Sequence, residues 1–289
     1  MTMLVTGATG QLGGLVVADL IKRGLAGRLA VSVRQTERAA GLKAQGVDVR
    51  QGDFDDPASL ARAFAGVERL LLVSTTDDNE TRIRQHKTAV RAAQEAGVKF
   101  IVYTSVINAD HNPLGLAEVH RTTEAAIRAS GIAYAFLRNN WYLENEAGFV
   151  RAALAGAPIH TSAGQGKVGW ALRSDYALAA AAVLATDGHE NKIYELSGTL
   201  TTYDEFGAAL GQVLGHPVTV EHVSDAAYGE SLSGSGLPAF LIPMFVDMAA
   251  KIREGALAVE GNDFQKLIGR PATPLREALQ QLVDQLQKH

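Results

Sequence analysis

The feature that most constrains the fold is a glycine-rich loop near the N-terminus. Residues 7–13 read GATGQLG, directly after a short strand-like segment at residues 4–6, so that Gly7, Gly10 and Gly13 recur at intervals of three. At this spacing one glycine permits a tight turn, one lets the backbone approach a pyrophosphate, and one lets a helix pack closely against a strand. A helix that begins here presents free N–H groups and the positive end of its dipole to phosphate. The loop therefore predicts a dinucleotide site.

Downstream of the loop, short apolar segments alternate with longer amphipathic ones. The pattern predicts strands at residues 4–6, 29–33, 47–50, 69–73, 100–104 and 133–137, and helices at residues 11–23, 37–45, 57–64, 81–96 and 116–130. The strands are apolar throughout, which is typical of a parallel sheet covered by helices on both faces. Right-handed crossovers then predict a doubly wound α/β fold of the Rossmann type.

The rhythm becomes less regular after about residue 155. Glycine and proline are frequent in residues 156–169 and 229–243. We therefore expect a Rossmann domain over residues 1–155 and a smaller C-terminal α/β lobe over residues 156–289. A late strand near residues 193–197 should return to the main sheet, and residues 274–287 should form an amphipathic helix.

Composition excludes several classes of protein. A net charge of −4 over 289 residues argues against a nucleic-acid partner. The absence of cysteine excludes disulfides, thiolate catalysis and cysteine-ligated zinc, and the eight histidines show no metal-ligand spacing. No apolar run is long enough to span a membrane, and the first residues lack the basic region of a signal peptide. We expect a cytoplasmic protein with no metal and no membrane partner, and the sequence is compatible with a homodimer.

The residue after the second predicted strand indicates which dinucleotide binds. An acidic residue there would bind the ribose 2′-hydroxyl of NAD, whereas an arginine accommodates the 2′-phosphate of NADP. The segment 30–33 ends in Arg34, whose planar guanidinium suits phosphate oxygens, and Arg38 follows one helical turn later. The sequence therefore predicts NADPH, although an arginine at a strand end can also be merely solvated.

Two further segments follow predicted strands and should face the cofactor, because ligands gather at the carboxyl ends of parallel strands. Asp53 and Phe54 come after the third strand and should contact the adenine. Ser74, Thr75 and Thr76 come after the fourth.

The proton donor of short-chain dehydrogenases is missing. Those enzymes need Tyr-x-x-x-Lys, in which the lysine lowers the pKa of the tyrosine. None of the seven tyrosines has a lysine four residues later. On the helix where the motif would fall, His120 and Glu124 are four residues apart and share one face. His120 could donate a proton, with Glu124 orienting it or raising its pKa. Alternatively the two form an ordinary surface pair, or His120 only shapes the pocket.

This absence restricts the reaction. Unactivated ketones and alcohols are poor substrates without a tuned tyrosine. A quinone is a strong hydride acceptor, and a cationic dye carbon needs only hydride. In either case the protein chiefly has to hold nicotinamide and a planar electrophile in contact and to exclude water.

Several segments together resemble the NmrA-like atypical short-chain dehydrogenases/reductases, and the resemblance runs nearly end to end. The matching segments are residues 5–13, Arg34 and residues 97–105, 113–116, 137–142, 173–177 and 266–271. The resemblance implies a Rossmann fold, NADPH and, within the family, the reduction of quinones or, second, of triphenylmethane dyes. Some members instead bind a dinucleotide and regulate a partner without turnover, so a redox sensor stays open.

The resemblance also implies the site residues. Tyr103, His120 and Tyr142 would shape the acceptor pocket, and Trp141 and Tyr142 would form its wall. The residues that would line the cofactor are Gly7, Ala8, Thr9, Gly10, Gln11, Leu12, Arg34, Ser74, Thr75, Thr76, Arg138, Asn139, Asn140, Trp141, Tyr142, Leu143 and Arg173.

Overall fold

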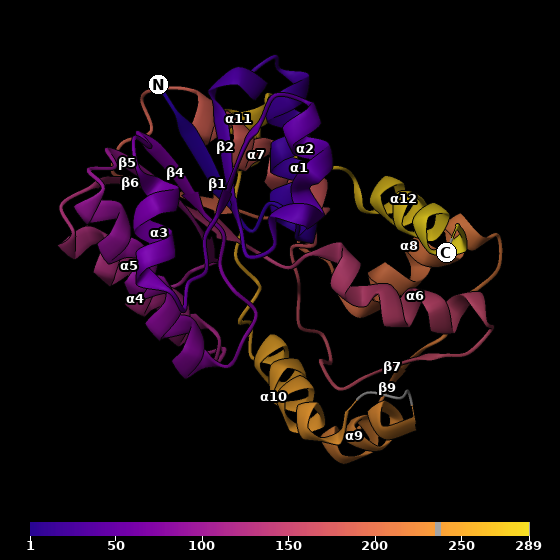
Figure 1. Cartoon of the computed structure of the whole chain (residues 1–289). Helices are drawn as coiled ribbons and strands as arrows, with labels where there is room; N and C mark the ends of the chain where they lie inside the picture. Colours follow the sequence, from indigo (N-terminus) through magenta and orange to yellow (C-terminus); the bar gives the residue numbers. More distant parts are fainter. Residues whose placement is uncertain (235–237, 289) are drawn as a thin grey trace.

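A seven-stranded, wholly parallel sheet forms the centre of the molecule (Figure 1). The computed structural model describes residues 1–234 and 238–288. The strand order is β3-β2-β1-β4-β5-β6-β8, which is the doubly wound order of a Rossmann fold, as predicted. The strands are β1 (Met3–Thr6), β2 (Leu29–Val33), β3 (Asp48–Gln51), β4 (Arg69–Leu72), β5 (Phe100–Val106), β6 (Ala133–Asn139) and β8 (Lys192–Leu196).

Helices cover both faces of the sheet because successive side chains of each strand point to opposite faces. On one face α1 (Gln11–Lys22) and α7 (Arg173–Ala185) pack against Val5, Val31 and Val102. On the other face α3 (Pro57–Phe64), α4 (Asn79–Glu95) and α5 (Ala117–Ala129) pack against Leu4, Leu70 and Ile101. Between β2 and β3 lie a 3-10 turn, η2 (Thr36–Ala39), and the short α2 (Ala40–Ala44).

The edge strand β3 departs from the predicted pattern. We expected every strand to be buried on both faces, yet Asp48 and Gln51 of β3 are exposed and the two residues between them are only partly covered. The reason is its position, because β3 pairs only with β2 and forms one border of the sheet. The burial expected from a parallel sheet holds for β1, β2, β4 and β5, in which every residue is buried.

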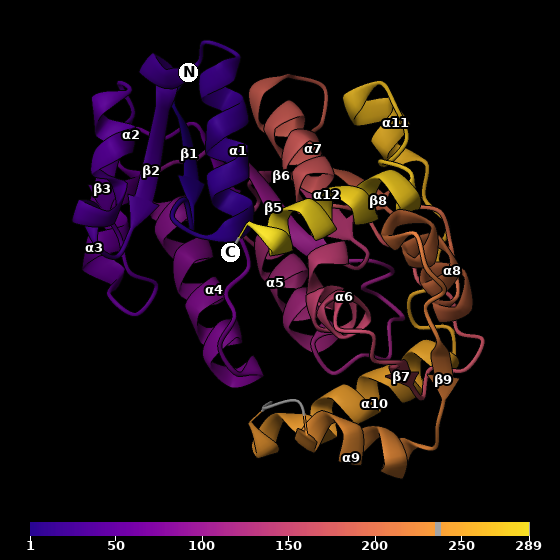
Figure 2. The same ribbon diagram turned by 90° about the vertical axis from the view of Figure 1, so that its right-hand side faces the viewer.

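A smaller lobe lies beside the carboxyl ends of the strands and has a core of its own, which includes Trp170, Phe206 and Leu279. It contains a two-stranded parallel sheet of β7 (Ile159–Thr161) and β9 (Val220–His222). Around that sheet are η3 (Leu143–Glu146), α6 (Ala147–Leu154), α8 (Tyr203–Leu214), α9 (Asp225–Gly234), η4 (Ala239–Leu241), α10 (Ile242–Arg253) and α12 (Leu275–Gln287). In the view of Figure 2, α9 and α10 form a pair at the lower end of this lobe.

Several segments after residue 156 return to the main sheet. Helix α7 packs along α1, strand β8 pairs with β6, and α11 (Asp263–Ile268) places Phe264 in the core beside α7. The two lobes are therefore interleaved along the chain. No helix in the described part of the chain is both long and apolar enough to cross a membrane.

Candidate active site

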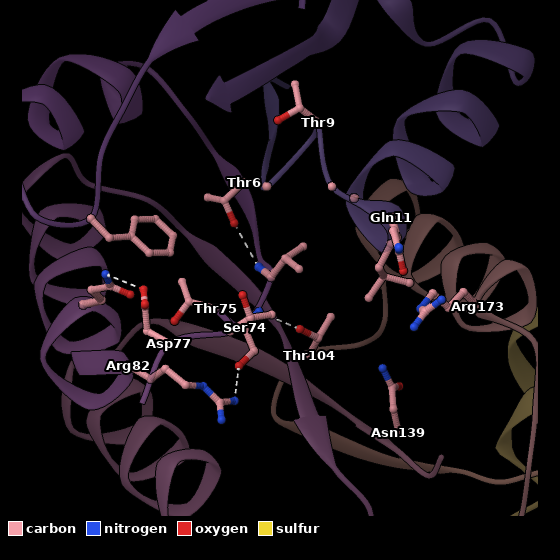
Figure 3. A pocket seen from close by; sticks show the side chains of 18 of the residues that line it. Thr6, Thr9, Gln11, Ser74, Thr75, Asp77, Arg82, Thr104, Asn139 and Arg173 are labelled. Carbon is pink, nitrogen blue, oxygen red and sulfur yellow. Dashed lines mark hydrogen bonds between the residues drawn. The ribbon is translucent and has the colours of Figure 1, made fainter. Parts of the chain in front are cut away.

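A cleft of about 710 Å³ lies at the carboxyl ends of the central strands, between the two lobes. It brings together most of the residues singled out from the sequence. These are Gly7, Thr9, Gly10, Gln11, Leu12, Arg34, Arg38, Asp53, Phe54, Ser74, Thr75, Thr76, His120, Asn139, Asn140, Trp141, Tyr142 and Arg173. Figure 3 shows how the side chains of Thr6, Ser74, Thr75, Thr104 and Asn139 surround the opening. Four of the expected residues do not line the cleft: Ala8, Tyr103, Arg138 and Leu143.

The glycine loop forms one end of the cleft. Gly7 has a φ of +63°, a left-handed conformation that favours glycine, and its carbonyl accepts a hydrogen bond from the Gly10 N–H at 2.9 Å. A Cβ on Gly13 would collide with the carbonyl of Gly7, so α1 begins in close contact with the loop. No side chain caps this helix. The N–H groups of its first turn are therefore available to an anion, which is the arrangement that a pyrophosphate requires.

The end of β2 carries positive charge. Arg34 and Arg38 are both exposed and line the cleft, and no acidic residue occupies the end of the strand. Asp53 and Phe54 lie opposite, after β3. The residues present thus fit a dinucleotide with a phosphate on its ribose.

The loop after β4 is held by side chains from neighbouring elements. The Thr6 hydroxyl accepts from the Val73 N–H at 2.9 Å, and the Thr104 hydroxyl accepts from the Ser74 N–H at 2.9 Å. The third support is His86, whose Nε2 accepts from the Thr75 N–H at 3.1 Å. Burial, together with the charge of Arg82, lowers the pKa of His86 to about 3, so its ring stays neutral and able to accept. This loop is therefore a rigid wall of the cleft.

Beyond that wall lies a chain of three side chains: Tyr103, His120 and Arg82. The hydroxyl of Tyr103 is 2.9 Å from Nδ1 of His120, and a terminal guanidinium nitrogen of Arg82 is 3.5 Å from Nε2 of His120. Burial, reinforced by the positive charge of Arg82, holds the pKa of His120 well below 6.5. His120 is therefore a neutral imidazole at physiological pH. Burial also raises the pKa of Tyr103 and of Tyr142, so both stay protonated.

Glu124 does not act on His120, which corrects one of the alternatives raised by their spacing. Its carboxylate accepts from Ser105 Oγ at 2.7 Å and from Arg138 Nε and a terminal nitrogen at 2.9 and 2.7 Å. Ser105 lies on β5 and Arg138 on β6, so these hydrogen bonds orient the Glu124 side chain toward the sheet. The partner of His120 is instead Tyr103 on β5.

Arg138 is a core residue in this structure, although the family resemblance implied a cofactor contact. Only 4% of its side chain is exposed, and besides Glu124 it pairs with Glu195 at 3.1 Å and Asp110 at 2.9 Å. Its donors therefore already face carboxylates behind the wall of the cleft. Of the other residues outside the cleft, Ala8 and Tyr103 are buried, and Leu143 packs in the core of the small lobe.

Aromatic residues line the part of the cleft where we predicted the acceptor. The Tyr142 hydroxyl accepts from the Asn139 side-chain amide at 3.1 Å, and the Arg173 guanidinium lies 5.2 Å from the centre of the Tyr142 ring. Trp141 lines the cleft beside them. Sequence reasoning missed Arg82, which faces this region from the first turn of α4. The only signal available was its position at the start of the helix predicted after the fourth strand.

Behind Trp141 lies a buried carboxylate, Glu146, which is 6% exposed. It accepts hydrogen bonds from Trp170 Nε1 at 3.0 Å and from the Tyr203 hydroxyl at 3.4 Å, and Trp141 is a third hydrogen-bonding neighbour. Burial raises the pKa of Glu146 from 4.5 to about 7. Both tryptophans of the chain therefore contact one titratable group.

Sheet order, glycine loop and cleft together define a Rossmann-type dinucleotide-binding protein. The model of the NmrA-like family matches residues 1–258, and the chain belongs to that family. It is 43% identical to quinone oxidoreductase 2 of Escherichia coli (strain K12) over 279 residues, 96% of this chain and 97% of the relative.

Two solved structures are similar over nearly the whole chain. Triphenylmethane reductase of Citrobacter sp., complexed with NADP(H), superposes with a TM-score of 0.93 at 41% identity, covering 98% of this chain and 100% of that one. The NADPH-dependent quinone oxidoreductase QOR2 of Escherichia coli, complexed with NADPH, has a TM-score of 0.92 at 42% identity, covering 97% of this chain and 99% of that one.

Proposed function

We propose that this protein is an NADPH-dependent reductase that transfers hydride directly to a quinone-like planar electrophile. One observation carries the proposal. One half of the cleft is lined by the glycine loop and two exposed arginines, which suit a dinucleotide phosphate, and the other half is aromatic and lacks the Tyr-x-x-x-Lys proton donor. The relatives of known activity support it, since they reduce quinones or triphenylmethane dyes and bind NADPH or NADP(H).

Each half of the cleft has its own task. The N–H groups at the start of α1 would bind the pyrophosphate, Arg34 and Arg38 the ribose phosphate, and Asp53 and Phe54 the adenine. NADPH supplies the hydride when it is bound. Asn139, Trp141 and Tyr142 would hold the acceptor against the nicotinamide and keep water away. We infer that the protein acts in the cytoplasm. The homodimer stays a prediction.

The activity is tested by following NADPH oxidation by absorbance with purified protein. A small benzoquinone and a cationic triphenylmethane dye are offered separately, each with a control lacking protein. We expect steady turnover with the quinone. Turnover with the dye alone would make the protein a dye reductase with the same site. Tight NADPH binding without turnover on either acceptor would contradict the proposal and indicate a redox sensor.

The choice of cofactor is tested with the variant Arg34→Ala. Loss of a charge-assisted contact of about 1.5–3 kcal/mol should reduce the preference for NADPH over NADH by roughly tenfold to a hundredfold. The kcat/KM with NADH should stay near that of the unaltered protein, because NADH carries no ribose phosphate, and it serves as the internal control. An unchanged preference would remove Arg34 from this role.

A further inference from the structure

Arg82 is a half-buried cation in the wall of the cleft that has no carboxylate partner. In residues 1–234 and 238–288, no Asp or Glu oxygen lies within ion-pair distance of its guanidinium. The two most buried arginines of the sheet differ in this respect, because Arg69 pairs with Asp187 and Arg138 with Glu124. The carboxylate of Asp77, which also lines the cleft, attracts Arg82 through space without forming an ion pair with it. A partly desolvated guanidinium that lacks a direct ion pair is costly to maintain, which points to an anionic ligand.

The guanidinium is oriented for such a ligand. A terminal nitrogen of Arg82 donates to Ser74 Oγ at 2.9 Å, as Figure 3 shows. This bond holds the guanidinium beside the loop that follows β4. The Nε of Arg82 is buried and has no hydrogen-bond partner among the described residues. Ser74 is itself fixed through its N–H by Thr104. The guanidinium is thus held in place before a ligand binds, and its Nε–H remains free to donate a hydrogen bond.

The side chains next to Arg82 carry no positive charge that could stabilise an anion in its place. His120 is a neutral imidazole, and the hydroxyl of Tyr103 is fully buried behind it. Three other arginines line the cleft: Arg34 and Arg38 follow β2, and Arg173 lies over the Tyr142 ring, where its side chain donates to Asn145 at 2.9 Å. Arg82 is therefore the cation beside Ser74 and His120.

We propose that Arg82 binds the carbonyl oxygen of the acceptor and stabilises the negative charge that forms there, so that the site selects acceptors that become oxyanions over acceptors that are cations. This inference rests on the proposed reductase function. The quinone is the oxidant: it gains a hydride from NADPH, which becomes NADP⁺, and carries the charge as a hydroquinone monoanion. A proton from solvent then completes the hydroquinone. A cationic dye becomes neutral on gaining hydride, so a fixed cation opposes its binding and stabilises nothing in its reduction.

The test compares Arg82→Met and Arg82→Lys on two acceptors, a neutral benzoquinone and a cationic triphenylmethane dye. Removing a preorganised donor from a developing oxyanion typically lowers kcat by about 100-fold or more. We expect a loss of about that size in kcat/KM with the quinone for Arg82→Met, and partial recovery in Arg82→Lys. With the dye, kcat/KM should be unchanged or increased. Arg91→Met, an exposed arginine on the same helix, is the matched control for charge and should leave both activities unaltered.

A binding measurement makes the test independent of turnover. The probe is 2-hydroxy-1,4-naphthoquinone, a quinone that is negatively charged at neutral pH, and its Kd follows from quenching of the fluorescence of Trp141 in the wall of the cleft. We expect Arg82→Met to weaken this binding by about tenfold or more and Arg91→Met to leave it unaltered. The experiment needs no reaction, so it judges Arg82 even if the proposed function fails.

Three outcomes would overturn the inference. Equal losses with quinone and dye would mean that Arg82 only positions Ser74. A weaker Kd for NADPH that accounts for the whole effect would assign Arg82 to the cofactor. Unaltered binding of the anionic probe would show that no acceptor oxygen contacts it. In contrast, absence of turnover in the unaltered protein with either acceptor refutes the proposed function and leaves the binding result to stand alone.

Discussion

Replacing Arg138 with Met should lower the free energy of unfolding by about 3–5 kcal/mol, because it breaks a buried ion pair. The cation that remains beside Glu124 is Arg128, at 3.2 Å, whose side chain is 38% exposed. The bidentate contact with Glu124 joins side chains that are 4% and 1% exposed, so the carboxylate cannot be rehydrated without opening the core. The loss is measured by urea denaturation at pH 7. If Arg138 instead served the cofactor, the variant would keep its stability and lose affinity for NADPH.

Two further variants sharpen this prediction. The double variant Arg138→Met with Glu124→Met removes both charges, so it should be more stable than Arg138→Met alone. Arg23→Met breaks an i,i+4 ion pair with Asp19 on the surface of α1 and should cost less than about 1 kcal/mol. A loss in Arg138→Met no larger than that in Arg23→Met would contradict the structural role.

The variant Glu146→Gln should change how stability depends on pH. The pKa of this carboxyl is about 7 when folded and 4.5 when exposed, so below pH 4.5 it is protonated in both states. Between pH 4.5 and 7 the unfolded chain loses the proton and the folded chain keeps it, which favours unfolding. The contribution of protonated Glu146 to the free energy of unfolding is therefore fully present below pH 4.5 and is lost as the pH rises through 7. The variant, which cannot ionise, should gain roughly 3 kcal/mol over the unaltered protein between pH 4.5 and 8.

Urea denaturation of both proteins at several pH values gives this difference, and the contributions of His86 and His120 cancel because both proteins contain them. Glu118→Gln is the matched control, since Glu118 is exposed on α5. Its stability difference should not vary with pH by more than a few tenths of a kcal/mol. Tryptophan fluorescence provides a second readout, because both tryptophans of the chain contact Glu146. A flat difference for Glu146→Gln would contradict the raised pKa.

The parts of the fold that local pattern determines could be predicted from the sequence. Glycine spacing and apolar strands predicted the first six strands, the parallel sheet and the loop at the start of α1. Helix α4 begins at Asn79 rather than at residue 81, because Asp78 caps it by accepting from the Thr81 N–H, a detail that apolar periodicity does not include. Burial of β3 was overestimated because sequence pattern does not say which strand forms the border of a sheet.

The site residues that could be predicted are those that come directly after the carboxyl ends of strands. Arg34 and the residues after β4 line the cleft as expected. Arg138 also follows this rule in sequence, but its partner Glu195 is 57 residues away, and only the folded chain shows that its donors are already occupied. Arg82 lies among the several arginines of α4, and the direction in which one of them points depends on Ser74 and on the packing of that helix.

The repeated passage of the chain between its lobes bears on how the cleft can open. The chain leaves the sheet after β6, returns for α7 and β8, leaves again for α8 to α10, and returns once more for α11 before α12. A lobe connected by a single linker can swing as a rigid body, whereas a lobe connected at several places is restrained at each of them. We therefore expect the cleft to be largely preformed, so that a ligand would diffuse into it without one lobe closing on the other.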